Sequence, residues 1–422
     1  MGMSTTGPPR RELSCWKEIA DYLGVSVRTA QHWETERRLP VRRFSGEKGR
    51  VGADPAELDR WRQATHAKPR WWSGPRFLRL WAGGATAVLL IAGAGYLLST
   101  RKGPPARFHH EFESLVVTDE QRRELWHKTF PETFDRLTTP EGLLAYHKAW
   151  FGDLDGDGRV ELLYTYSPAS VETTGETLFC FSHDGREKWR FAPGGTVATR
   201  QGAFPRSYNG IAFRLLPPER DGTRRIVLTV HHSPRFPNQV AVLSHQGAVL
   251  GEYWHSGHLG LMELADLDGD GKPEILMAGI SNGYKAATLL VLDPSNLGGA
   301  SQEENLDYQL QGLGPGREKA RILFPRTCIN RKFHEYGVAG RLAVHGDSIE
   351  VAVSEGTTVR GEWNLLVFYG LNRKLELADV VVNDPLKAAH RELEAAGQLD
   401  HSLTDKEISE LRHLRYLKRL GD

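Results

Sequence analysis

The spacing of hydrophobic residues divides the chain into three regions. Before residue 66, apolar residues recur three and four positions apart, as on one face of a helix. After residue 108 they alternate with polar residues or form short runs between Gly and Asp turns, as in β-strands. Between these regions, residues 80–98 are nineteen consecutive positions without a charge. The pattern predicts a multidomain chain with a small helical domain, one apolar helix and a β-sheet domain.

The first region predicts a compact unit over residues 12–66, after a disordered N-terminus at 1–11. We expect Ser14 to cap a helix that ends at Gly24, and Ser26 to cap a second helix. A glycine- and arginine-containing segment after Pro40 predicts a β-hairpin, and the D-P-x-E sequence from Asp54 predicts a third helix. The apolar positions of the first two helices are Trp16, Ile19, Ala20, Leu23, Val27, Ala30 and Trp33.

This unit resembles the winged helix-turn-helix of the MerR and excisionase group. The residues that carry the resemblance are SCWKEIADYLGVSVRTAQHWE, RRLPVRR and ELDRW. The resemblance implies a small, all-α winged domain that binds DNA. The implied contacts to bases or phosphates are Arg28, Thr29, Gln31 and His32 on the second helix, with Arg42, Arg43, Lys48 and Arg50 of the wing on phosphates. A helical module that no longer binds DNA, or that binds protein instead, is the alternative.

The apolar segment 80–98 predicts a single transmembrane helix. Nineteen helical residues span about 28 Å, close to a bilayer core of about 30 Å. More Lys and Arg residues precede the segment than follow it, so we expect a cytoplasmic N-terminus in a bacterial inner membrane. Residues 67–79 and 99–107 are then linkers, and the C-terminal domain is periplasmic or extracellular. A buried helix of a globular domain is the alternative.

Charge supports two different surroundings for the two ends. Residues 1–79 carry a net charge of +7 and the remainder carries −6, although the whole chain is at +1. The length of 422 residues allows several cores, and the composition excludes a collagen-like, a mostly disordered or a small disulfide-stapled protein.

Two segments of the third region repeat almost letter for letter. They are FGDLDGDGRVELLYTY from Phe151 and LADLDGDGKPEILMAG from Leu264. Each places three carboxylates at alternate positions in a Gly-containing loop, which suits a cation that takes six to eight oxygen ligands. We predict two structural Ca²⁺ ions, with solvated acidic turns as the alternative. The predicted ligands are Asp153, Asp155, Asp157 and Glu161 with the carbonyl of Arg159, and Asp266, Asp268, Asp270 and Glu274 with the carbonyl of Lys272.

Strand–turn–strand segments ending in Trp alternate with these loops, beginning at Leu115, Leu178 and Val240. Their spacing predicts about five blade-sized sets of strands over residues 108–384. The loops resemble the FG-GAP or VCBS repeats of integrin-α-like β-propellers, which implies an all-β, propeller-like domain. Degenerate turns near Asp221 and Asp347 should keep the strands and lose the ion. An open β-sandwich array is the structural alternative.

The last residues, 385–422, return to helical spacing. Helices are predicted over 385–396 and 404–420, so the β-domain has a helical C-terminal tail. Of the three cysteines, Cys180 and Cys328 either form a disulfide in an exported domain or are two unpaired buried thiols. Both readings stay open.

No catalytic motif is found among the residues. The seventeen His residues form no H-E-x-x-H pattern, and C-x-x-C, G-x-S-x-G and phosphate-binding glycine patterns are also absent from the sequence. We therefore expect a non-enzymatic, membrane-tethered transcriptional regulator that binds DNA inside the cell. Outside, its propeller would bind a glycan, peptide or protein, with a homodimer carrying the signal. A surface adhesion protein whose propeller binds glycan or protein is the alternative function, and a propeller hydrolase or lyase is a third.

Overall fold

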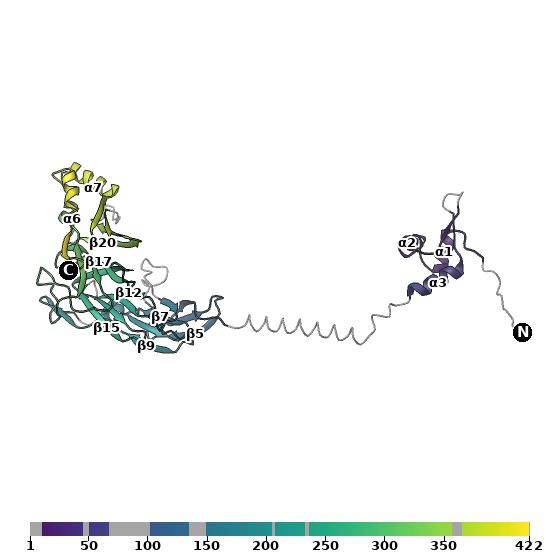
Figure 1. Cartoon of the computed structure of the whole chain (residues 1–422), viewed down its shortest axis with the longest axis horizontal. Coiled ribbons are helices and arrows are strands. Elements are labelled where there is room, and N and C mark those ends of the chain that lie inside the picture. Colours follow the sequence, from purple (N-terminus) through teal and green to yellow (C-terminus); the bar gives the residue numbers. More distant parts are fainter. Residues whose placement is uncertain are drawn as a thin grey trace. The chain divides into compact units, whose positions relative to one another are not determined.

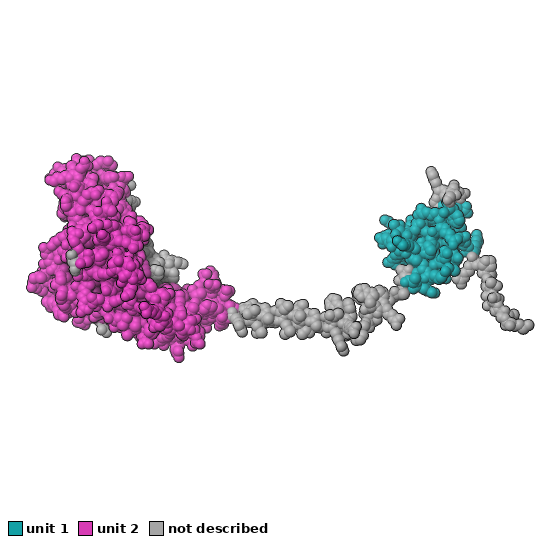
Figure 2. Space-filling model, viewed as in Figure 1, with its two compact units in different colours: residues 1–101 teal, residues 102–422 magenta. Residues whose placement is uncertain are grey.

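The computed structural model describes residues 11–44, 50–66, 102–134, 149–204, 207–232, 236–356 and 365–421. The chain forms two compact units, residues 1–101 and residues 102–422 (Figure 2). The first is small and helical. The second is built from strands and carries most of the chain.

The N-terminal unit has helices α1 (Trp16–Leu23), α2 (Val27–Arg37) and α3 (Pro55–His66), with a hairpin of β1 (Arg42–Arg43) and β2 (Val51–Gly52) between α2 and α3. Ser26 caps α2 by accepting a hydrogen bond from the Thr29 amide at 3.1 Å. Residue Cys15, rather than Ser14, is the N-cap of α1. The core consists of Ile19, Ala20, Leu23, Ala30, Leu39, Val51, Ala53 and Leu58.

No helix in the described part of the chain is long and apolar enough to cross a membrane. The segment 80–98, predicted to be the transmembrane helix, lies outside the described residues. The single-pass topology and the inner-membrane localisation are therefore not supported. The observed fold class is correspondingly mostly β.

The second unit contains five antiparallel sheets formed in chain order. The first sheet has β3 (Arg107–Glu111), β4 (Ser114–Thr118) and β5 (Glu124–Thr129); the second has β6 (Ala149–Gly152), β7 (Glu161–Tyr166), β8 (Thr177–Phe181) and β9 (Glu187–Phe191). The third has β12 (Tyr208–Leu215), β13 (Ile226–His232), β14 (Asn238–Leu243) and β15 (Val249–His255). The fourth has β16 (Gly257–Ala265), β17 (Glu274–Ser281), β18 (Ala286–Leu292), β19 (Glu318–Leu323) and β24 (Arg415–Lys418).

The fifth sheet has β20 (Val338–His345), β21 (Ser348–Ser354), β22 (Leu366–Asn372) and β23 (Leu377–Val382). A separate hairpin, β10 (Val197–Thr199) with β11 (Gly202–Phe204), lies between the second and third sheets in the chain. Short helices α5 (Val171–Thr174) and α6 (Cys328–Phe333) belong to connections, and α7 (Asp384–Ala395) and α8 (Asp405–Glu410) follow the fifth sheet.

Each sheet buries apolar side chains against the next one in the series. Four hydrophobic clusters join the first sheet to the second, the second to the third, the third to the fourth and the fourth to the fifth. Figure 1 shows the sheets following one another in chain order from β5 to β20. No core cluster of the described residues joins the first sheet to the fifth. The unit is therefore a propeller-like series of face-to-face sheets, without a core that closes it into a ring.

Tryptophan–glycine contacts repeat between successive sheets. The Trp126 indole donates to the carbonyl oxygen of His183 at 3.2 Å and lies on Gly185. Trp189 repeats the contact with Gly247 and with the carbonyl two residues before that glycine, at 2.8 Å. A Cβ atom on either glycine would come within 2.6 Å of the ring, so no larger residue fits there. These contacts show that two of the repeated Trp residues, Trp126 and Trp189, pack between successive sheets.

The tail differs from the two helices predicted for residues 385–420. Helix α7 lies close to the predicted span, and Thr404 caps α8 by accepting from the Glu407 amide at 3.3 Å. Helix α8 ends at Glu410, however, and β24 pairs antiparallel with β19. Pairing satisfies backbone groups that an edge strand would leave open, and this outweighs the helical spacing of the leucines.

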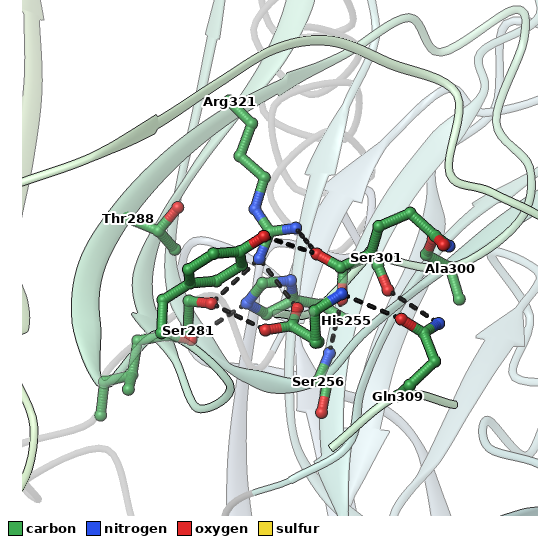
Figure 3. Close-up of polar contacts among 12 residues, drawn as sticks. His255, Ser256, Ser281, Thr288, Ala300, Ser301, Gln309 and Arg321 are labelled. Carbon is green, nitrogen blue, oxygen red and sulfur yellow. Dashed lines mark hydrogen bonds and ion pairs between the residues drawn. The ribbon is translucent and has the colours of Figure 1, made fainter. Parts of the chain in front are cut away.

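The connection between β18 and β19 is fixed by a buried ionic cluster around Arg321 (Figure 3). Arg321 is 2% exposed, and its guanidinium donates to Glu303 at 2.8 Å and to the Ser281 hydroxyl at 2.9 Å. It also donates to the backbone carbonyl of Gln302 at 2.9 Å. Burial of this charge is tolerated because carboxylate, hydroxyl and carbonyl oxygens surround it. The cluster therefore holds residues 301–303 against the fourth sheet.

We predict that Arg321→Met lowers the free energy of unfolding of the second unit by about 3 to 5 kcal/mol, because Glu303 is left as an uncompensated buried charge. Urea denaturation of the full chain, followed by tryptophan fluorescence, measures the change. The double variant Arg321→Met/Glu303→Gln should lose less. As a control, Lys285→Met breaks an exposed pair with Glu335 and should cost less than about 1 kcal/mol. Equal losses in Arg321→Met and Lys285→Met would contradict the role of the cluster.

Candidate metal-binding loops

The first acidic loop connects β6 to β7 and is shaped by its own carboxylates. The two oxygens of Asp153 accept hydrogen bonds from the amides of Gly156 at 2.7 Å and Gly158 at 2.9 Å. The Oε2 atom of Glu161 accepts from the Leu154 amide at 2.9 Å. Both glycines have φ near +80°, a region that L-residues avoid, so the tight loop requires them.

The second acidic loop, between β16 and β17, has the same hydrogen bonds. Asp266 accepts from Gly269 at 2.7 Å and Gly271 at 2.9 Å, and Glu274 accepts from the Leu267 amide at 2.9 Å. The repeated sequence therefore folds twice into one conformation. This conformation gathers carboxylates at one end of two different sheets.

The structure brings most of the predicted ligand side chains together. In the first loop each of four carboxylates places an oxygen within 4.8 Å of the others: Asp153, Asp155, Asp157 and Glu161. In the second loop the converging side chains are Asp266, Asp268 and Glu274, whereas Asp270 is not among them. Such an all-oxygen, strongly anionic donor set suits a hard cation such as Ca²⁺. The carbonyl ligands proposed for Arg159 and Lys272 stay predictions.

A lysine ammonium group contacts the carboxylates of each loop. Lys188 of β9 contacts Asp155 and, at 3.2 Å, Glu161. Lys319 of β19 contacts Asp268 at 2.7 Å and Glu274 at 2.5 Å. The two loops thus share a cation–carboxylate pairing that their own sequence does not contain.

The charges at these contacts shift the pKa values in the directions expected of ion pairs. Burial alone would lower the pKa of Lys188 and Lys319, but the facing carboxylates outweigh it and raise both. The Lys319 hydrogen bond lowers the pKa of Asp268. For Asp155, burial opposes the contact with Lys188, yet the net pKa is lowered. Each lysine is therefore charged and partly neutralises its loop.

Both lysines occupy the same irregular position in their sheets. Each of the five sheets has a one-residue β-bulge near the start of one strand, where one residue has no partner on the preceding strand. The bulged strands are β5, β9, β15, β19 and β23. The bulged residues in the five sheets are Leu125, Lys188, Leu250, Lys319 and Ala378. Lysine is found only in the two sheets that carry a complete acidic loop.

The degenerate turns neutralise their acidic residues with arginine instead. In the third sheet Arg225 stands at the closing Glu position and donates to Glu219 at 2.9 Å. In the fifth sheet Arg373 pairs with Asp347 at 2.7 Å. Among the described residues, neither turn brings together the carboxylates that an ion would need.

A cavity of about 250 Å³ borders the second acidic loop. Its walls come from the turn before β13, the acidic loop and the turn after β18. Both signs of charge line it: Glu219, Arg225, Asp270, Lys272, Glu274, Asp293 and Lys319. A polar or charged ligand group could therefore be bound beside the loop.

Several of the predicted DNA contacts in the N-terminal unit lie beside carboxylates. Arg28, Thr29 and Gln31 lie on α2, and Lys48 is outside the described residues. Arg42 pairs with Glu57 at 3.2 Å and Arg43 with Glu34 at 2.8 Å, and the Nε2 atom of His32 lies 3.1 Å from Glu36. Carboxylates beside these cations reduce the attraction for phosphate.

No family model matches the sequence, and no curated protein matches it either. Several solved structures match at low similarity. One is a protein of unknown function from Bacteroides caccae, 8% identical with a TM-score of 0.23, where the match covers 68% of this chain and 93% of that one. The C-terminal domain of PilY1 from Pseudomonas aeruginosa is 12% identical with a TM-score of 0.36, covering 72% and 61%. BamB from Moraxella catarrhalis is 11% identical with a TM-score of 0.25, covering 64% and 71%.

These comparisons correct the family assignments made from the sequence. Neither the MerR and excisionase group nor the FG-GAP and VCBS repeats are supported by a family model. The DNA-binding and transcriptional roles, which rested on the first resemblance, are withdrawn with it. The coarser description holds: the chain is β-rich and propeller-like, with stacked antiparallel sheets.

Sequence reasoning missed the two lysines, although a signal was present. The segment G-R-E-K occurs at 185–188 and again at 316–319, each time at the start of the fourth strand of a sheet with an acidic loop, β9 or β19. The shared segment could have linked these strands to the loops, but Lys188 is 33 residues from Asp155 and Lys319 is 51 residues from Asp268. Only the sheet register brings them together.

We predict that Lys188→Met and Lys319→Met each destabilise the protein in the presence of a chelator. The loss should be about 1 kcal/mol per site, because the carboxylates lose a cation at a position that is partly exposed. Thermal unfolding in EDTA measures the effect. Lys374→Met, which changes an exposed turn lysine before β23, is the matched control. Unchanged melting of both loop variants in EDTA would show that the ammonium groups do not neutralise the loops.

Proposed function

We propose that residues 102–422 form a non-enzymatic binding domain whose sheets are stabilised by two Ca²⁺ ions. Its ligand is a glycan, a peptide or a protein. The observation that carries the proposal is the pair of acidic loops, which have the same backbone conformation and gather carboxylates at the ends of the second and fourth sheets. A repeated site of this kind in a series of stacked sheets suits binding at the loops.

In this proposal the protein supplies most of the calcium ligands. Asp153, Asp155, Asp157 and Glu161 would hold the first ion, and Asp266, Asp268 and Glu274 the second. The ion would screen the mutual repulsion of the carboxylates and join the start of each loop to the following strand. Lys188 and Lys319 would then compete with the ion for some of the same carboxylate oxygens, and this competition lowers the calcium affinity of each loop.

A structural role fits the loops better than a catalytic one. Asp153 and Asp266 already accept two backbone hydrogen bonds each, so their carboxylates are committed to the loop conformation. An ion held by several protein carboxylates leaves few positions for a reacting water or substrate. For these reasons the proposal assigns the domain no reaction.

The proposed ligand site is the cavity beside the second loop. Glu274 and Lys319 contact each other and both line the cavity. An ion bound to the second acidic loop would therefore change the charge of the cavity. Arg225, which pairs with Glu219, also lines the cavity and gives a second cation for a carboxylate or a hydroxyl-rich sugar. Binding there should therefore depend on calcium.

We expect calcium to raise the melting temperature of the full chain by about 5 °C at millimolar concentration, because an ion that binds only the folded state stabilises it. The double variant Asp153→Asn/Asp266→Asn should lose most of this shift. Asp307→Asn, an exposed loop residue away from both sites, should keep it. Equal melting of the unchanged protein in calcium and in EDTA would remove the calcium part of the proposal.

We also expect the full chain to bind members of a glycan or peptide array in calcium, and to lose this binding in EDTA. Arg225→Ala should reduce the signal at least about tenfold if the cavity is the site, since it removes a charged contact to the ligand. Arg373→Ala, which breaks the exposed ion pair of the fifth sheet with Asp347, is the control. Array binding that is indifferent to both calcium and Arg225 would contradict the assignment of the cavity.

A further inference from the structure

A second cluster of metal-ligand side chains lies in the C-terminal part of the chain, far from the acidic loops in sequence. Cys328 begins α6, His390 is on α7, His401 lies between α7 and α8, and Glu407 is on α8. One ligand atom of each lies within 4.8 Å of all the others. Four residues from four separate positions thus converge on one point.

Among the described residues, the buried members of this cluster have no hydrogen-bond partner outside the cluster. His390 is 2% exposed, and neither of its ring nitrogens makes a hydrogen bond. Both carboxylate oxygens of Glu407 are likewise buried, and the groups that face them are Cys328, His390 and His401 of the cluster itself. Burying an imidazole and a carboxylate in this way is costly unless something binds them. The two side chains point to a ligand between them.

The distances within the cluster suit a tetrahedral ion. Glu407 Oε2 is 3.7 Å from His390 Nε2 and 3.4 Å from His401 Nε2. In a tetrahedral zinc site with bonds of about 2.0 to 2.3 Å, the ligand atoms are about 3.3 to 3.8 Å apart. These two separations therefore match those of a zinc site, and the remaining ligand atoms lie within 4.8 Å of one another.

His401 is also oriented for coordination. Its Nδ1 atom lies 2.8 Å from the carboxylate of Asp400, and its Nε2 atom faces Glu407. A carboxylate on the far nitrogen of a metal-bound histidine fixes the ring and strengthens it as a ligand. Asp400 is therefore a positioning residue for the site.

We propose that Cys328, His390, His401 and Glu407 bind one Zn²⁺ ion. Sulfur and imidazole donors favour zinc, or a similar transition metal, over calcium, which takes oxygen ligands. Four protein ligands fill a tetrahedral shell, so the ion is structural and leaves no open position for catalysis. The proposal is independent of calcium binding and of the ligand cavity.

The ion would fasten the helical tail to the connection that follows β19. Leu386 of α7 and Leu411 after α8 pack into the core shared by the fourth and fifth sheets. Cys328 comes from α6, whose N-cap Thr327 is hydrogen-bonded to the buried Glu355 at 2.6 Å. Zinc would thus join α6, α7 and α8 and set the path of the chain into β24.

The test is metal binding by the full chain in millimolar calcium, which keeps the acidic loops saturated. Elemental analysis after equilibration with Zn²⁺ and removal of the excess should find one zinc per chain. Co²⁺ in place of zinc should give a thiolate-to-metal absorption band, which Cys328→Ser abolishes. His401→Gln, at a half-exposed position, should keep the fold and lower zinc affinity at least about tenfold.

Matched controls are Cys15→Ser and His413→Gln, which change a cysteine and a histidine outside the cluster. Both should bind zinc as the unchanged protein does. Less than one zinc per chain in the unchanged protein would overturn the proposal. So would a zinc affinity in Cys328→Ser and in His401→Gln that equals the affinity of the unchanged protein. Loss of calcium binding with zinc binding intact would leave this site standing and remove only the calcium sites.

Discussion

Face-to-face burial of neighbouring sheets is the constraint on which the rest of the structure depends. A three- or four-stranded sheet with apolar residues on both faces cannot hide them alone, so each sheet is stable only beside the next. The second sheet shows this well, because Tyr164 packs toward the first sheet and Leu163 toward the third. Indole rings on glycines fix the spacing at two of these junctions. The acidic loops, the bulges and the cavity are all placed by that stacking.

The five sheets share one backbone plan and differ in how they neutralise charge. Each sheet has a bulge at the same place, where one residue has no partner on the neighbouring strand. Where the loop is strongly acidic, that residue is lysine; where it is not, it is leucine or alanine. The third and fifth sheets use arginine within or beside the turn itself. The five sheets therefore differ at a few positions that control charge, while the faces that they bury against one another are all apolar.

Sequence periodicity predicted the features that depend on near neighbours. The helices near Trp16 and Val27, the strands after the acidic loops and the cap at Thr404 all follow from local patterns. It failed where long-range pairing decides the outcome, as at Arg415–Lys418, where strand pairing to β19 replaces a predicted helix. It also failed at Cys328 and His390, because residues brought together by tertiary packing have no fixed spacing. Family resemblance proved the least dependable guide, since short motifs can match without a shared family.

The pairing of β24 with β19 has a consequence for the order in which the domain can form. The strand that completes the fourth sheet is synthesised only after the whole of the fifth sheet and both tail helices. Until then β19 presents an open edge of backbone amides and carbonyls to any other strand nearby. The fourth sheet, although it lies inside the series, is thus among the last to be finished, and during synthesis its edge is exposed to mispairing.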